Sequence, residues 1–167
     1  AIGRAPALNR QHWGFTHWLG HQPNLWNQLK TEATQNECES EAIIYASDID
    51  PHALRATQYN AKSLGVQGLQ TQQQDFFKMD IPKTSGGLLL TNPPYGTRLG
   101  HIEELVPLYG QIGDIFKEKL DGWDAYVFCP ANLLSKSIGL KAKSRLPLMN
   151  GAIDCRLLHF PIKGRNT

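Results

Sequence analysis

The sequence predicts an α/β fold with a largely parallel sheet that ends in an antiparallel hairpin. Short apolar runs at residues 42–47, 87–91 and 125–129 alternate with segments of helical periodicity, which is the pattern of strand–helix–strand units. Asn150-Gly151 joins the last two strand-like runs, and this pair is typical of hairpin turns. A chain of 167 residues is long enough for one domain with its own core and short for two.

The amino-terminal part predicts a loop, a helix, a strand and a capped helix. Residues 5–22 mix Pro, Gly and aromatic residues without a clear period, so we expect a structured loop, and residues 24–35 fit a helix. After the strand at 42–47, Asp50 and Pro51 suit the N-cap and first turn of a helix. Small or apolar residues keep one face of that helix and a glycine ends it: Ala53, Leu54, Thr57, Ala61, Leu64 and Gly65.

The strand at 87–91 is apolar on successive residues, which predicts that neighbouring elements cover both of its faces. A weaker strand precedes it at 68–73. Apolar residues recur at helical spacing over 104–119, and Pro107 predicts that this helix starts near it. The remaining expected elements are a strand, a short helix and the two hairpin strands, at residues 125–129, 131–138, 142–149 and 152–161.

The composition, with 41% hydrophobic and 19% charged residues, is that of an ordinary globular protein. No apolar run approaches the roughly 18 to 20 residues that a membrane-spanning helix needs, and we find no basic-then-apolar leader. Cys38, Cys129 and Cys155 are far apart and form no C-x-x-C pair, and the histidines show no metalloprotease-like pattern. We therefore expect a cytoplasmic protein with no membrane contact, no disulfide framework and no metal.

Residues 136–167 carry seven basic residues against one acidic residue, a net charge of +6, whereas the preceding residues sum to −4. A basic segment on a nearly neutral body suits contact with a phosphate backbone. From charge alone, the preferred interpretation is a solvated face that protects the edge of the sheet.

The strongest motif is Asn92-Pro93-Pro94-Tyr95, directly after the strand at 87–91, because ligands of open α/β sheets bind beyond the carboxyl ends of strands. An exocyclic amine on a base is a poor nucleophile, since its lone pair is delocalised. The side-chain oxygen of Asn92 and the carbonyl of Pro93 can accept its N–H bonds and favour a pyramidal nitrogen. The two prolines stiffen that carbonyl, and Tyr95 offers a face for stacking on a flipped-out base. The alternative interpretation is a structural Pro-Pro loop.

Two acidic segments follow the other predicted strands. Asp48 is placed to accept the hydroxyls of a nucleoside ribose, with Ile49 to pack on the adenine and Asp50 to cap the next helix. After the following strand, Asp75 could accept the adenine amino group, with Phe76 as an apolar wall. The alternative interpretation makes Asp48 a second cap and Asp75 a turn residue.

These three sites, in this order, resemble the class I S-adenosylmethionine-dependent methyltransferases that modify amino groups. The aromatic segment at residues 10–21 (RQHWGFTHWLGH), followed by Trp26, is more specific. It is similar to the large-subunit (23S) ribosomal RNA guanine-N2 methyltransferase family, and more narrowly to the first catalytic half of that family's fused bifunctional enzyme. The resemblance runs over essentially the whole chain. The alternative interpretation of the aromatic residues is that most of them cap the sheet.

The resemblance implies a Rossmann-like class I fold, S-adenosylmethionine as the cofactor, and guanine N2 of large-subunit rRNA, unassembled or partly assembled, as the acceptor. It implies no metal and no covalent intermediate. Catalysis would rest on the motif Asn92, Pro93, Pro94 and Tyr95. The cofactor would contact Asp48, Ile49, Asp75, Phe76 and Asn92.

The chain departs from the family at its amino end. The family has a central first strand followed by a glycine-rich loop, but no G-x-G pair occurs in this sequence, and the RNA-binding THUMP module further upstream has no counterpart. We expect residues 1–167 to be a partial, amino-terminally truncated catalytic domain that begins inside the helix after that loop. The missing strand would belong between those at 42–47 and 87–91, supplied by an upstream segment of the same protein.

Two other functions stay open. One is adenine-N6 methylation of DNA, because the tetrapeptide is shared by adenine-N6, guanine-N2 and glutamine-N5 enzymes and defines chemistry rather than substrate; the aromatic segment argues against it. The other is a non-catalytic fragment that contacts RNA and does not hold the cofactor by itself.

Overall fold

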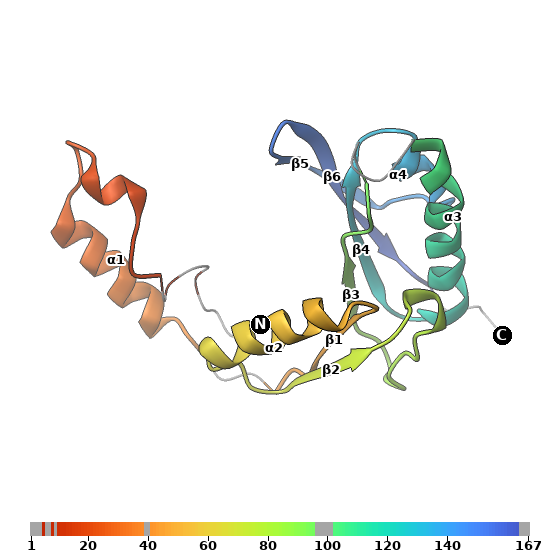
Figure 1. Cartoon of the computed structure of the whole chain (residues 1–167), viewed down its shortest axis with the longest axis horizontal. Helices are drawn as coiled ribbons and strands as arrows, with labels where there is room; N and C mark the ends of the chain where they lie inside the picture. Colours follow the sequence, from red (N-terminus) through yellow and green to blue (C-terminus); the bar gives the residue numbers. More distant parts are fainter. Residues whose placement is uncertain (1–4, 6–7, 9, 39–40, 96–101, 164–167) are drawn as a thin grey trace. The chain divides into compact units, whose positions relative to one another are not determined.

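The computed structural model describes residues 5, 8, 10–38, 41–95 and 102–163 (Figure 1). The chain divides into two compact units, the first ending at Phe76 and the second beginning at Phe77.

The first unit contains two parallel strands and two α-helices. Its elements are η1 (Gly14–His17), α1 (Pro23–Gln35), β1 (Ile44–Asp48), α2 (Pro51–Ser63) and β2 (Leu69–Gln73). The two strands pair in parallel, from Ile44 opposite Leu69 to Asp48 opposite Gln73. Because parallel strands end at the same edge of a sheet, the residues that follow β1 and β2 emerge side by side.

The capping signals predicted for α2 are confirmed. The side chain of Asp50 accepts a hydrogen bond from the backbone N–H of His52 at 2.8 Å, and Pro51 occupies the first turn. Leu54, on the predicted apolar face, is buried. Gly65 follows the helix with a φ of 65°, a conformation that residues with a Cβ rarely adopt.

The second unit is a four-stranded sheet with two helices. At the boundary lies η2 (Phe76–Lys78), and the elements that follow are β3 (Leu88–Thr91), α3 (Ile102–Lys119), β4 (Asp124–Pro130), α4 (Leu133–Ser137), β5 (Ser144–Asn150) and β6 (Ile153–Pro161). The strand order is β3-β4-β6-β5, with β3 parallel to β4 and the other neighbours antiparallel. The parallel pairs and the final hairpin confirm the predicted fold class.

The core of the second unit lies between α3 and one face of this sheet (Figure 1). Phe116 of α3 and Phe160 of β6 are both buried, and their ring centroids are 6.2 Å apart. The residues around them are buried as well: Tyr109, Ile112, Ile115, Ala125, Val127 and Leu158. The apolar stripe predicted for residues 104–119 therefore forms the covered side of α3.

The predicted start of α3 was wrong, because the helix runs over Ile102–Lys119 with Pro107 inside it. A proline in a helix lacks the N–H that would bond the carbonyl four residues earlier, here that of Glu103. Glu103 lies in the exposed first turn, where water can bond its carbonyl oxygen. The buried stripe that follows stabilises the helix despite this lost bond.

One face of β3 is largely exposed in this chain, whereas its apolar sequence predicts cover on both faces. Leu88 and Leu90 are 63% and 65% exposed. They alternate with half-buried Leu89 and Thr91, because successive side chains of a strand point to opposite faces. Among the strands that the structure describes, β3 pairs only with β4 and β1 only with β2, so each has an open edge.

Within the described ranges, no helix combines the length with the hydrophobicity that a transmembrane span requires.

Candidate active site

All three predicted site segments lie at or just beyond the carboxyl end of a strand. Asp48 is the last residue of β1, Asp75 and Phe76 follow β2 and are half-buried, and Asn92 directly follows β3. The segments after β1 and β2 belong to the first unit, and the segment after β3 belongs to the second.

The carboxylate of Asp48 shapes the turn between β1 and α2. Its Oδ1 accepts a hydrogen bond from the backbone N–H of Asp50 at 2.8 Å, and the residue is exposed. No hydrogen bond joins its Oδ2 to any residue in the described ranges. Asp48 thus has the turn role of the alternative interpretation, and it also keeps an acceptor atom for a ligand at the end of a parallel strand.

The loops that follow β1 and β2 are hydrogen-bonded to each other. The side-chain Nε2 of Gln73 donates to the carbonyl oxygen of Ile49, and the backbone N–H of Gln74 donates to that of Asp48, both at 3.1 Å. These bonds hold the segment before Asp75 against the end of β1. Because Ile49 is 68% exposed, this end of the first unit presents an apolar side chain next to a carboxylate.

The loop after β3 presents hydrogen-bond acceptors. Asn92 is exposed, Pro93 is buried and Pro94 is exposed. A proline has no N–H and a nearly fixed φ, so this loop offers stiffly held carbonyl oxygens and few donors. Such a surface suits a ligand group that carries N–H bonds, as an exocyclic amine does.

Tyr95 is held at both its hydroxyl and its ring. Its Oη accepts a hydrogen bond from the side-chain Nδ2 of Asn150 at 2.8 Å, and its ring lies edge-on to Phe128 at a centroid distance of 6.2 Å. Burial raises the pKa of the Tyr95 phenol above its ordinary value, and the hydrogen bond from Asn150 partly offsets this rise. The phenol is therefore neutral near neutral pH and acts as a polar aromatic surface rather than as a base.

Tyr109 supports the same loop from the core. It is fully buried, and its hydroxyl donates to the carbonyl oxygen of Pro94 over a long 3.5 Å. Burial raises the pKa of Tyr109, so this hydroxyl keeps its proton. The carbonyl of Pro94 is thereby directed at the protein.

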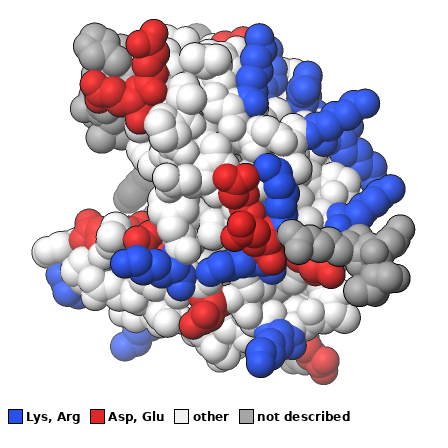
Figure 2. Space-filling view, turned by 90° about the vertical axis from the view of Figure 1, so that its right-hand side faces the viewer, with Lys and Arg blue, Asp and Glu red and all other residues white. Residues whose placement is uncertain are grey.

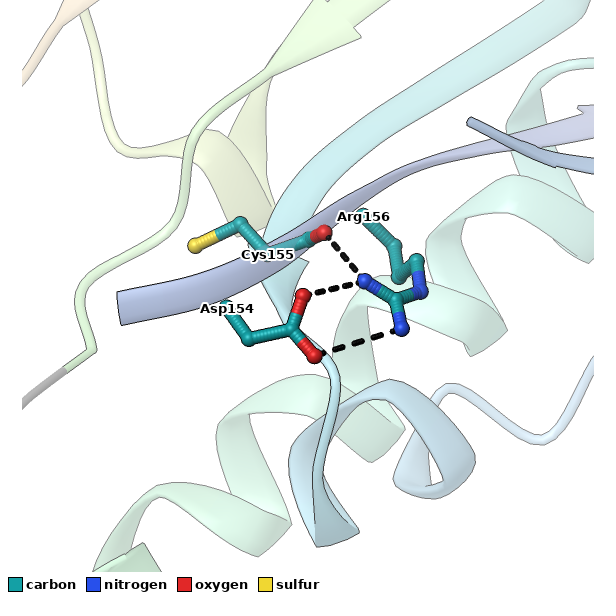
Figure 3. A network of polar contacts seen from close by, with 3 residues as sticks. All are labelled: Asp154, Cys155 and Arg156. Carbon is teal, nitrogen blue, oxygen red and sulfur yellow. Dashed lines mark hydrogen bonds and ion pairs between the residues drawn. The ribbon is translucent and has the colours of Figure 1, made fainter. Parts of the chain in front are cut away.

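The predicted basic segment is largely exposed in the second unit. Five of its cationic residues are exposed to solvent: Lys136, Lys141, Lys143, Arg145 and Lys163. Figure 2 shows Lys and Arg side chains gathered along one margin of the face in view. Arg156 differs, because it forms an ion pair with Asp154 and donates to the carbonyl oxygen of Cys155 at 2.9 Å (Figure 3). The exposed cations are the ones suited to a phosphate backbone.

The aromatic segment forms a cluster in the first unit. The ring of Trp26 lies edge-on to those of Trp13 and Phe15, at centroid distances of 5.1 and 5.0 Å. Trp18, which is 73% exposed, and Leu29 line a neighbouring groove of about 390 Å³. These aromatic rings thus pack against one another. The alternative interpretation, in which the aromatic residues cap the sheet, does not hold for the exposed Trp18.

Three neighbours of the motif were missed by sequence reasoning. Asn150 and Phe128 lie 55 and 33 residues from Tyr95, whose side chain they contact. Tyr109 lies 15 residues from Pro94, whose carbonyl it contacts. The only sequence signal was the turn at Asn150-Gly151, which predicts a hairpin and not a partner. Among the described residues, no group of three or more His, Cys, Asp or Glu could hold a metal ion.

Residues 1–159 match the family model for the RMKL-like methyltransferase domain. Curated relatives have the same name, ribosomal RNA large subunit methyltransferase K/L. That of Syntrophotalea carbinolica is 38% identical over 95% of this chain, and that of Pseudoalteromonas atlantica is 36% identical over 99% of it. The matched regions are 23% and 24% of those proteins, so the chain spans about a quarter of their length.

Solved structures share the fold. A possible methylase from Clostridium difficile 630 superposes with a TM-score of 0.77 and 26% identity, covering 99% of this chain and 44% of that one. A proposed methyltransferase crystallised with SAH has a TM-score of 0.75 and 24% identity, covering 99% of this chain and 43% of that one. Both share the α/β architecture described above.

Proposed function

Because this chain belongs to the RMKL-like methyltransferase domain family, we propose that its protein transfers a methyl group from S-adenosylmethionine to an exocyclic amino group of a ribosomal RNA base. The observation that carries this proposal is the loop after β3. It presents an exposed Asn92 and two conformationally restricted prolines at a strand end, followed by an anchored aromatic ring, Tyr95. These are the groups that an amine acceptor on a planar base requires.

The first unit fits the adenosine part of the cofactor. Asp48 has an acceptor oxygen for the ribose hydroxyls, Ile49 has an exposed side chain for the adenine, and Asp75 follows the neighbouring strand end. When bound, S-adenosylmethionine supplies the methyl group. Its methionine part needs the close backbone approach that a glycine-rich turn allows, and no G-x-G pair occurs in the sequence.

The second unit is assigned to the acceptor base. The side-chain oxygen of Asn92 and the carbonyl of Pro93 accept the N–H bonds of the amine, which favours a pyramidal nitrogen whose lone pair is available. Pro94 stiffens the backbone, and its carbonyl is engaged by Tyr109. Tyr95 stacks on the base. Each of these groups exerts its effect by orienting the amine rather than by taking its proton.

We assign the acceptor more narrowly to guanine N2 in large-subunit rRNA that is unassembled or partly assembled, in the cytoplasm. The names of the curated relatives support rRNA, and the aromatic segment with Trp13, Phe15 and Trp26 supports the guanine-N2 branch. The exposed cations of residues 136–145 suit the phosphate backbone.

We further propose that residues 1–167 are part of a larger catalytic domain, in which an upstream segment supplies the glycine-rich loop and a strand. Support comes from the open edges of β1 and β3 and from the exposed side chains of Tyr45, Leu88 and Leu90. A strand that lacks a neighbour and exposes apolar side chains is suited to pairing with another strand.

The test uses the longest polypeptide that contains this chain. It is incubated with radiolabelled S-adenosylmethionine and either unmethylated 23S rRNA or double-stranded DNA, and the products are digested to nucleosides. The expected product is N2-methylguanosine in rRNA alone. N6-methyladenine in DNA would establish the rival enzyme class, and the absence of any methylated nucleoside would favour a non-catalytic RNA-contacting role.

A further inference from the structure

The hydrogen bond between Asn150 and Tyr95 joins the loop after β3 to the opposite edge of the sheet. In the order β3-β4-β6-β5, these two strands are the outermost ones. Neighbouring strands lie roughly 5 Å apart, so the edges are separated by about 14 Å. Yet the Oη of Tyr95 and the Nδ2 of Asn150 are 2.8 Å apart. The loop after β3 and the Tyr95 side chain together therefore reach across the end of the sheet.

The strand register explains how β5 meets this side chain. Leu148 lies opposite Cys155, and Cys155 lies opposite Pro130 of β4, so these residues share one face of the sheet. Asn150 lies two residues after Leu148 in β5, and Phe128 lies two residues before Pro130 in β4, so both share this face. Figure 3 shows the sulfur of Cys155 pointing away from the Asp154–Arg156 ion pair, which is thus on the other side of β6. Tyr95 contacts the face that carries Asn150 and Phe128.

The position of Asn150 in the hairpin leaves its side chain available for this role. Asn150 pairs with Ile153 as the last residue of β5, and the two-residue loop is Gly151-Ala152. Gly151, with a φ of 59°, takes the left-handed conformation of the turn. The Asn150 amide is therefore not needed to form the turn and is directed at Tyr95.

We propose that Asn150 is a positioning residue that fixes the ring of Tyr95 in the orientation in which it stacks on the acceptor base. This inference rests on the proposed function. Contact with Phe128 restrains only the ring edge, whereas the hydrogen bond anchors the far end of the side chain. A ring anchored at both places loses little further freedom when a base stacks on it, and such preorganisation favours the reactive geometry.

A double-mutant cycle in the longest polypeptide that contains this chain tests the proposal. Tyr95→Phe removes only the hydroxyl, and Asn150→Ala removes only its partner. Single-turnover methyl transfer with saturating rRNA should fall about tenfold in each variant, and the double variant should be no slower than the slower single variant. Rates that multiply in the double variant, or a normal rate for Asn150→Ala, would overturn the proposal.

Two controls separate positioning from a merely structural role. Met149→Ala alters the adjacent, 63% exposed residue of β5, which points to the other face, and should leave the rate unchanged. Asn150→Asp replaces the donating amide with a carboxylate that can accept from the Tyr95 hydroxyl, so a bond of reversed direction should recover part of the rate. If Asn150→Asp recovers none of the rate and Met149→Ala is as slow as Asn150→Ala, Asn150 only stabilises the hairpin, and the proposal is overturned.

A urea titration of the four proteins of the cycle (unaltered, Tyr95→Phe, Asn150→Ala and the double variant) tests the contact independently of the proposed function. The contact predicts that the double variant unfolds at the same urea concentration as the less stable single variant. If the unaltered protein methylates no RNA base, the proposed function is overturned and the positioning role with it, even where unfolding is coupled. If the unaltered protein methylates RNA but the effects of the two substitutions on unfolding add up, only the role of the Asn150 contact is overturned.

Discussion

Gly113 of α3 and Ile138, just after α4, approach so closely that a Cβ atom on Gly113 would lie 1.8 Å from the carbonyl oxygen of Ile138. Both residues are buried. The two helices therefore meet backbone to backbone, at a place where only a residue without a Cβ fits. This contact holds α4 next to the helix that forms the core of the second unit.

Gly113→Ala should lower the free energy of unfolding by about 1–3 kcal/mol, because the added methyl group must displace a buried carbonyl. Urea denaturation followed by circular dichroism measures this change. The matched control is Gly110→Ala, one turn earlier, where the new Cβ would lie an ordinary 3.7 Å from the carbonyl oxygen of Ser137. This control should be neutral or stabilising by roughly 0.5–1 kcal/mol. Equal stability of both variants would show that α4 moves aside freely.

Asn92→Ala should reduce single-turnover methyl transfer on the order of 100-fold or more, because it removes a hydrogen bond to the reacting amine. The dissociation constant for S-adenosylmethionine should change by less than about tenfold. Asn132→Ala is the control, since that amide caps α4 by accepting the N–H of Leu134. A near-normal rate for Asn92→Ala would remove Asn92 from the catalytic assignment.

Asp48→Ala should weaken S-adenosylmethionine binding, because each charge-assisted hydrogen bond to the ribose contributes roughly 1.5–3 kcal/mol. Isothermal titration calorimetry measures the effect. Asp50→Ala is the matched control: it removes the cap of α2, at a cost of roughly 0.5–2 kcal/mol in stability, and should leave the ribose bonds intact. An unchanged dissociation constant for Asp48→Ala would leave Asp48 with its turn role only.

Residues 1–167 by themselves should bind S-adenosylmethionine poorly, although they contain both proposed adenosine-side carboxylates, Asp48 and Asp75. The physical reason is the lack of a glycine-rich turn for the methionine part, together with the open edges of β1 and β3. Calorimetry of this chain beside a longer polypeptide should show binding and a cooperative melt in the longer one alone. Micromolar binding by the 167-residue chain would contradict the proposed upstream contribution.

The stability of the second unit should fall as the pH rises from about 9 to about 11. Burial, followed by the influence of Cys155, raises the pKa of the Cys129 thiol from 9.0 to about 11. A raised folded-state pKa contributes stability that is present below the unfolded value and is lost as the pH passes the folded value. Urea denaturation across this range should show the loss, and Cys129→Ala should reduce it.

Local signals in the sequence were enough to predict most elements and the places of the site segments. Asp50 and Pro51 begin α2, and Gly65 follows its end, because capping and turn chemistry involve residues within a few positions of one another. In the same way, the apolar run before Asn92 predicts a strand whose end carries the motif. The family resemblance, which rests on the three site segments and the aromatic segment at residues 10–21, was confirmed.

Other features depend on residues that are distant in the sequence, and only the tertiary structure decided them. Pro107 lies inside α3 because the buried stripe beyond it stabilises the helix more than the missing bond weakens it. Leu88 and Leu90 are exposed because the cover of a strand depends on which elements pack against it, not on its own residues. The bond between Tyr95 and Asn150 exists because strand pairing brings two outer strands within reach of one side chain. Hydrophobic pattern specifies which residues avoid water, whereas pairing and packing determine which of them meet.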